Sequence, residues 1–129
     1  MFERIVVGVS KADSAKEAAR RAIELAQKFG AELHLVVAFE GTDTGPQSAS
    51  RRHAEGMLES IALSYSGKTL THALPDDPTA AILRVADEVD ADLIVVGNKG
   101  MRGAARVLGS VPNSIAHKAS CSVLIVSTT

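Results

Sequence analysis

Short runs of apolar residues alternate along this chain with longer segments in which apolar residues recur every three or four positions. The short runs are rich in valine, isoleucine and leucine, which predicts strands, and they lie at residues 5–9, 33–39, 69–74, 93–96 and 122–127. The longer segments have the spacing of amphipathic helices and lie at residues 14–29, 50–64, 77–89 and 110–119. This alternation predicts an α/β fold, an open parallel five-stranded sheet with four helices on both faces.

Polar residues at the segment boundaries support these elements. Asp77 followed by Pro78 is typical of a helix N-cap and of the first helical position. Ser14 and Glu17 have the spacing of a capping box, in which the glutamate reaches back to the serine that starts the helix. The strand at 69–74 alternates polar and apolar residues, so we expect it at an edge of the sheet with one face only partly covered.

A glycine-rich segment separates the apolar strand at 93–96 from the last predicted helix. Residues 97–113 contain four glycines, three cationic side chains and no carboxylate. Glycines allow backbone N–H groups to come close to a phosphate, and the N-terminus of a helix adds unpaired donors and a favourable dipole. Ser110 is placed to cap that helix. The segment predicts an anion site; the alternative is a plain connection, which usually needs only a few residues.

Composition and charge narrow the picture further. The 129 residues predict one domain, 1–129, and with 46% hydrophobic but only 3% aromatic residues the core must be aliphatic. The net charge of −1 argues against nucleic acid or a membrane as partner. All carboxylates lie at or before Asp92, so positive charge gathers around the glycine-rich segment. The lone Cys121 excludes an internal disulfide, and without a signal peptide or spanning segment we expect a cytoplasmic protein.

The pattern Gly97-x-x-Gly100, a spacer, then Gly109-Ser110 resembles the nucleotide-binding signature of the universal stress protein family, and the resemblance covers the whole chain. The spacer, Met101 to Leu108, is one residue shorter than the family usually has. The resemblance implies the strand order 3-2-1-4-5, which makes the first and fourth strands neighbours. Ligands of open α/β sheets bind at such a switch point, beyond the carboxyl ends of the strands.

The resemblance also implies a ligand: an adenine nucleotide, either ATP, AMP or cyclic AMP, with magnesium bound only through ATP phosphates. The residues themselves predict no catalytic residue and no metal ligand, because the chain has no cysteine–histidine pair or metal-ligand spacing. The residues that match nucleotide-binding positions, or lie among them, are Val9, Ser10, Val37, Gly97, Lys99, Gly100, Gly109, Ser110, Val111 and Pro112. Four of them, the three glycines and Ser110, match phosphate- and ribose-binding positions.

Other members of this set have a second interpretation. Val9 and Val37 match positions beside the adenine ring, although plain core packing is equally open for them. Lys99 can neutralise phosphate charge or simply be a solvated lysine. Ser10 stands where nucleotide-binding members usually have an aspartate, and a serine offers a shorter, uncharged acceptor. We therefore expect weaker ATP affinity, with nucleotides of fewer phosphates binding nearly as well.

These observations predict an adenine-nucleotide-binding sensor or regulatory protein of the stress response. An alternative is a dimeric interaction module whose crevice is vestigial and binds nothing. A slow ATP hydrolase is a third possibility, which Ser10 disfavours, and the chain lacks the P-loop motif of ordinary nucleotide hydrolases. The apolar strand at 122–127 is expected at a sheet edge, and the family pairs it with its two-fold mate, so we expect a homodimer.

Overall fold

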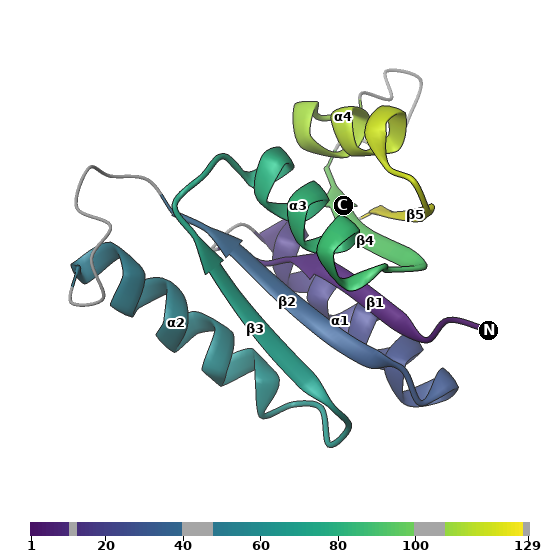
Figure 1. Cartoon of the computed structure of the whole chain (residues 1–129), viewed down its shortest axis with the longest axis horizontal. Coiled ribbons are helices and arrows are strands. Elements are labelled where there is room, and N and C mark those ends of the chain that lie inside the picture. Colours follow the sequence, from purple (N-terminus) through teal and green to yellow (C-terminus); the bar gives the residue numbers. More distant parts are fainter. Residues whose placement is uncertain (11–12, 40–47, 100–107, 128–129) are drawn as a thin grey trace.

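A computed structural model describes residues 1–10, 13–39, 48–99 and 108–127. Strands and helices alternate strictly along the chain (Figure 1). The elements are β1 (Arg4–Gly8), α1 (Asp13–Phe29), β2 (Glu32–Ala38), α2 (Ala49–Ala62), β3 (Thr69–Leu74), α3 (Pro78–Val89), β4 (Leu93–Asn98), α4 (Ser110–Lys118) and β5 (Ser122–Ser127). All neighbouring strands are parallel, in the order β3-β2-β1-β4-β5. The predicted fold class and strand order are confirmed.

The helices form a layer on each face of the sheet (Figure 1), with α1 and α2 on one face and α3 and α4 on the other. Side chains of β1 alternate between the two layers, as the pleat of a strand requires. Ile5 and Val7 belong to the core beneath α1 and α2, whereas Val6 belongs to the core beneath α3 and α4. Burial on both faces explains why β1 and β4 are continuous apolar runs.

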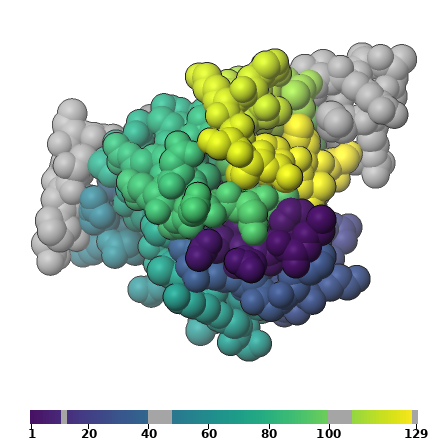
Figure 2. Space-filling model, turned by 45° about the vertical axis from the view of Figure 1, so that its right-hand side comes forward, coloured from purple at the N-terminus to yellow at the C-terminus, as the bar shows by residue number. Residues whose placement is uncertain are grey.

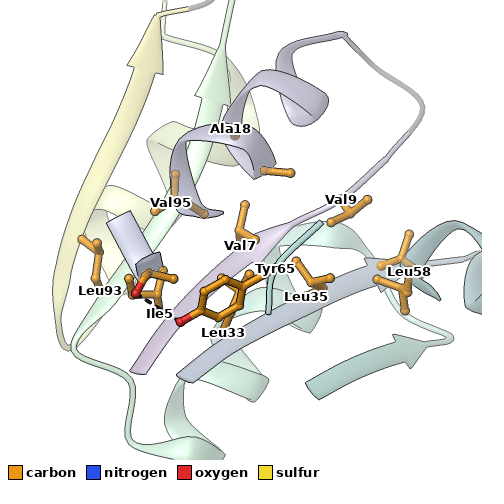
Figure 3. Packing of buried hydrophobic residues seen from close by; sticks show 14 of the residues in the cluster. Ile5, Val7, Val9, Ala18, Leu33, Leu35, Leu58, Tyr65, Leu93 and Val95 are labelled. Carbon is orange, nitrogen blue, oxygen red and sulfur yellow. Dashed lines mark hydrogen bonds between the residues drawn. The ribbon is translucent and has the colours of Figure 1, made fainter. Parts of the chain in front are cut away.

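The core beneath α1 and α2 is aliphatic except for a few rings (Figure 3). Leu33, Leu35 and Val95 are fully buried there beside the small residues of α1, such as Ala18. Tyr65 enters this core with its ring, and its hydroxyl lies 2.7 Å from the carbonyl oxygen of Ala31 and 3.1 Å from that of Ala26. One buried hydroxyl is therefore a hydrogen-bond donor for backbone carbonyls near the end of α1 and just before β2.

The amino ends of the central strands are held by a second side chain. The carboxylate of Asp92 accepts hydrogen bonds from the backbone N–H groups of Glu3, at 2.8 Å, and Arg4, at 3.1 Å. Figure 2 shows the N-terminal segment, in purple, lying on the surface against the green part of the chain. Asp92 precedes β4, so it ties the start of β1 to its neighbour in the sheet.

One local expectation differs from the structure. Helix α1 begins at Asp13, so Ser14 lies inside the helix, and Glu17 pairs with Arg20 rather than reaching back to the cap. Strand β5 lies at the sheet edge as expected, yet its apolar residues are only partly covered, and Leu124 is 38% exposed. Asp77 caps α3 as predicted, and its carboxylate accepts hydrogen bonds from the N–H groups of Thr79 and Ala80. In the described part of the chain, no helix is both long and apolar enough to cross a bilayer.

Candidate functional site

A cavity of about 410 Å³ opens where β1 and β4 end at their carboxyl sides. These two strands are neighbours in the sheet, and the chain leaves them toward opposite helical layers, which creates a crevice between the outgoing segments. Described residues from the ends of β1, β2 and β4 and from the first turns of α1, α3 and α4 line the cavity. The position of the cavity agrees with the switch point that the strand order implies.

Three helices present their N-terminal turns to this cavity. Ser14 and Ala15 come from α1, Pro78 from α3, and Ser110 and Val111 from α4. The first turn of a helix has N–H groups without intrahelical acceptors, and its end of the dipole is positive. The end of α3 is already capped by the carboxylate of Asp77, which accepts from the N–H groups of Thr79 and Ala80, so the ends of α1 and α4 are the ones that favour a negatively charged group.

The side chains of the cavity divide into an apolar part and a polar part. Val36, Ala38 and Ile82 form an apolar wall from β2 and α3. Ser10 and Lys99 lie at the ends of β1 and β4, and among the described lining residues Lys99 alone carries a charge. An apolar wall beside an electropositive rim suits a ligand with a flat apolar part and an anionic part.

Most of the residues predicted for the site lie around this cavity. Those that line it are Val9, Ser10, Gly97, Lys99, Gly109, Ser110, Val111 and Pro112. Gly100 lies outside the described residues, as do Arg102 and Arg106 of the glycine-rich segment.

Val37 is the exception among the described residues. It belongs to the opposite core, beneath α1 and α2, and does not line the cavity. Its neighbours Val36 and Ala38 line the cavity, because successive side chains of a strand point to opposite faces of the sheet. Of the two interpretations left open for Val37, core packing is the one that the structure shows.

Packing requires a glycine at position 97 but only favours a small residue at position 109. A Cβ at Gly97 would overlap the backbone carbonyl of Ser14, so this glycine lets α1 lie directly against β4. Gly109 has an ordinary φ of −61°, so its backbone does not demand a glycine. A Cβ there would instead lie 3.1 Å from Oδ1 of Asn98.

The N-cap of helix α4 lies one residue earlier than predicted. Gly109 is the N-cap and, having no side chain, makes no side-chain capping bond, while Ser110 is the first helical residue. The carbonyl oxygen of Gly109 accepts from the N–H of Asn113 at 3.0 Å, and Pro112 has no N–H to donate. The first turn of α4 thus offers the N–H groups of Ser110 and Val111 to the cavity.

Sequence reasoning overlooked Asn98 at the end of β4. Its side chain is 3% exposed; Oδ1 accepts from the N–H of Gly109 at 2.7 Å, and Nδ2 donates to the carbonyl of Lys99 at 2.7 Å. A signal was present, because an amide directly after an apolar buried strand must find polar partners inside the protein. The partner, eleven positions further on, is visible only in the folded chain.

A second polar cluster lies away from the cavity, on β2 and β3. His34 is 1% exposed, with Nδ1 2.9 Å from Nε2 of His72 and Nε2 2.7 Å from a carboxylate oxygen of Glu32. Burial, and then the charge of His34, lower the pKa of His72, against a smaller opposing effect of Glu88. Within the described residues, no group of histidine, cysteine and carboxylate side chains is arranged to hold a metal ion.

Comparison with known proteins identifies the family to which this chain belongs. The sequence pattern of the universal stress protein family matches residues 1–127, and the chain belongs to that family. It is 31% identical over 150 residues to a universal stress protein of Mycobacterium tuberculosis, covering 99% of this chain and 98% of the relative. It is 34% identical over 136 residues to one of Thermus aquaticus, covering 98% and 99%.

Solved structures show the same fold with ligands. A universal stress protein in complex with cAMP superposes with a TM-score of 0.82, at 28% identity, covering 99% of each chain. A universal stress protein from Archaeoglobus fulgidus in complex with dAMP gives a TM-score of 0.72, at 27% identity, covering 97% of this chain and 98% of that one.

Proposed function

We propose that this protein binds an adenine nucleotide in the cavity between β1 and β4 and that binding serves a regulatory role in the stress response. The observation that carries the proposal is the meeting of the N-termini of α1 and α4 at a cavity whose remaining wall is apolar. The helix ends suit a phosphate, and the wall formed by Val36, Ala38 and Ile82 suits a purine ring. The same proposal treats residues 1–129 as one domain, since all the strands share one sheet.

The described donors favour a nucleotide with one phosphate. The N–H groups of Ser110 and Val111, together with the ammonium of Lys99, supply enough partners for a single phosphate group. Two relatives with the same fold were solved with cAMP and with dAMP, each of which has one phosphate. We expect AMP and cyclic AMP to bind at least as tightly as ATP.

Isothermal titration of the full chain with ATP, AMP, cyclic AMP and GMP tests this proposal. We expect heat of binding for the adenine nucleotides and little or none for GMP. Lys99→Glu places a negative charge at the cavity and should weaken binding, whereas Lys28→Glu, an exposed lysine at the far end of α1, should not. If the folded parent binds none of these nucleotides, the alternative of an interaction module with a non-binding crevice is favoured.

We also propose that β5 pairs with β5 of a second copy to form a homodimer. Strand β5 is an edge of the sheet, and its Val123, Ile125 and Val126 are only partly covered, while Leu124 is exposed. An apolar edge strand of this kind invites pairing with another chain, and a two-fold axis would let each copy cover the other.

Sedimentation of a charged edge variant tests the dimer. Leu124→Asp adds a charge at an exposed position, so it should leave the fold intact and shift the protein to monomer. Leu63→Asp, at a residue that is 90% exposed beyond α2, is the matched control and should remain dimeric. A parent protein that sediments as a monomer at micromolar concentration contradicts this proposal.

A further inference from the structure

The side chain of Asn98 joins two parts of the site that are distant in sequence. It stands at the end of β4 and accepts a hydrogen bond from the N–H of Gly109, the N-cap of α4, at 2.7 Å. Its Nδ2 donates to the carbonyl of Lys99 at 2.7 Å, so the amide is held at both ends. Because Asn98 is 3% exposed, water does not readily replace these bonds.

The consequence for α4 follows from the planarity of peptide bonds. The Asn98 bond fixes the peptide unit that carries the N–H of Gly109. The carbonyl of Gly109 accepts from the N–H of Asn113 at 3.0 Å, which fixes the next peptide unit, the one that carries the N–H of Ser110. In a trans peptide the N–H points opposite to the carbonyl, so the Ser110 N–H is directed out of the helix end toward the cavity.

We propose that Asn98 is a positioning residue, which aims the N–H groups of Ser110 and Val111 at the phosphate of the bound nucleotide without touching the nucleotide through its own Oδ1. The proposal rests on the nucleotide-binding function proposed above. The Gly109 N–H is already used by Asn98, so it is not available to the ligand. A glycine at position 109 leaves room for this clamp, since a Cβ there would make a tight contact with the Asn98 Oδ1, at 3.1 Å.

A positioning role makes a specific prediction about which part of the ligand is affected. In the proposed binding mode, the N–H groups of Ser110 and Val111 contact the phosphate, and the base rests on the apolar wall from β2 and α3. Loss of the clamp should therefore weaken AMP but not adenosine, which lacks the phosphate. Misfolding or a collapsed cavity would weaken both ligands together.

The experiment measures AMP and adenosine affinities by calorimetry for the parent, Asn98→Ala and Asn113→Ala. Asn113 is an exposed amide on α4 and serves as the matched control. We expect Asn98→Ala to lose about tenfold in AMP affinity, the size expected for losing well-directed hydrogen bonds to a charged group, with adenosine affinity changed by less than about twofold. Asn113→Ala should change neither. Amide hydrogen exchange at Gly109 should accelerate in Asn98→Ala only.

A second variant keeps the test valid if Asn98→Ala does not fold. Asn98→Asp has nearly the same shape and retains an acceptor for the Gly109 N–H, so that amide should stay protected, although the variant lacks the Nδ2 donor to the Lys99 carbonyl. Its negative charge beside the phosphate should lower AMP affinity while sparing adenosine. Equal losses for both ligands, or unchanged AMP affinity in Asn98→Ala, would overturn the positioning role. A folded parent that binds neither ligand would overturn the nucleotide-binding function itself, and this role with it.

Discussion

The two ends of the sheet use side chains in opposite ways. At the amino end, the Asp92 carboxylate and the Tyr65 hydroxyl bind backbone groups of neighbouring segments and leave those groups satisfied. At the carboxyl end, α1 and α4 begin at a cavity, and the first turn of α4 presents the N–H groups of Ser110 and Val111 to it. Side chains of the protein therefore bind the backbone groups at one end of the sheet, whereas the other end has backbone donors at an open cavity.

The two ends also differ in charge. The amino end contains carboxylates such as Asp92 and Glu32, while the described lining of the cavity holds Lys99 and no carboxylate. A carboxylate close to the phosphate would repel it, and at the amino end carboxylates can instead accept from backbone N–H groups. Three substitutions and a change of pH test this contrast between the two ends.

Gly97→Ala should have the largest effect, because it adds a Cβ that overlaps the backbone of Ser14 at the carboxyl end. Overpacking against backbone should lower the free energy of unfolding by about 3 kcal/mol and displace the start of α1. Gly56→Ala is the control: nothing lies within 4 Å of its added Cβ in α2, so it should stabilise by about 0.5–1 kcal/mol. Urea unfolding measures both, and equal stability of the two variants would contradict the packing role of Gly97.

Tyr65→Phe breaks the closure at the amino end without changing the ring. It removes the hydrogen bonds to Ala26 and Ala31 and should lower the free energy of unfolding by about 1–2 kcal/mol. AMP affinity should be unchanged, because Tyr65 does not line the cavity. A clear loss of AMP affinity in a variant that remains folded would show that the two ends are not independent.

Ser10→Asp adds a carboxylate at the cavity, where nucleotide-binding members of the family usually have one. A charged acceptor binds a ribose hydroxyl more strongly than a serine does, so adenine nucleotides should bind about tenfold more tightly, or about 1.4 kcal/mol. Calorimetry measures the change, with Ser66→Asp, an exposed serine outside the cavity lining, as control. Unchanged affinity for every adenine nucleotide would place the ribose away from Ser10.

Acid should lower the free energy of unfolding through His72 on β3, and this is the smallest of the four effects. Burial, followed by the charge of His34, lowers the pKa of His72 below its ordinary value of 6.5. As pH falls below 6.5, the unfolded chain takes up the His72 proton before the folded chain does, so stability decreases until the lower folded pKa is passed.

The pH effect can be isolated from that of Glu32. Burial raises the pKa of the Glu32 carboxyl, but hydrogen bonds from His34 and Lys68 outweigh this and lower it below 4.5, so its contribution is lost only at more acidic pH. Urea midpoints at pH 7.5 and 5.5 should therefore differ less in His72→Gln than in the parent. His53→Gln, at an exposed histidine of α2, should keep the parental difference; if His72→Gln keeps it too, His72 is not the titrating group.

The pattern of apolar residues along the chain determined most of the fold. Strand and helix ranges such as 69–74, with Asp77 and Pro78 starting α3, are predictable because local periodicity and capping chemistry are written in neighbouring residues. The cavity is predictable for a related reason: glycines, cations and a helix start follow one another along the chain, and the family resemblance supplies the strand order that the pattern alone leaves open.

Which side chains come into contact depends on how the elements pack in the folded chain. Val37 and Val36 are indistinguishable in sequence, yet the pleat turns one into the core and the other toward the cavity. The hydrogen bond between His34 and His72, and the one between Asn98 and Gly109, form only when strands and helices have packed. The helices and strands and their order along the chain can be predicted from the sequence alone, because they depend on the conformational preferences of neighbouring residues. The partners of buried polar groups depend on contacts between distant residues, and these form only when the sheet and its two helical layers assemble.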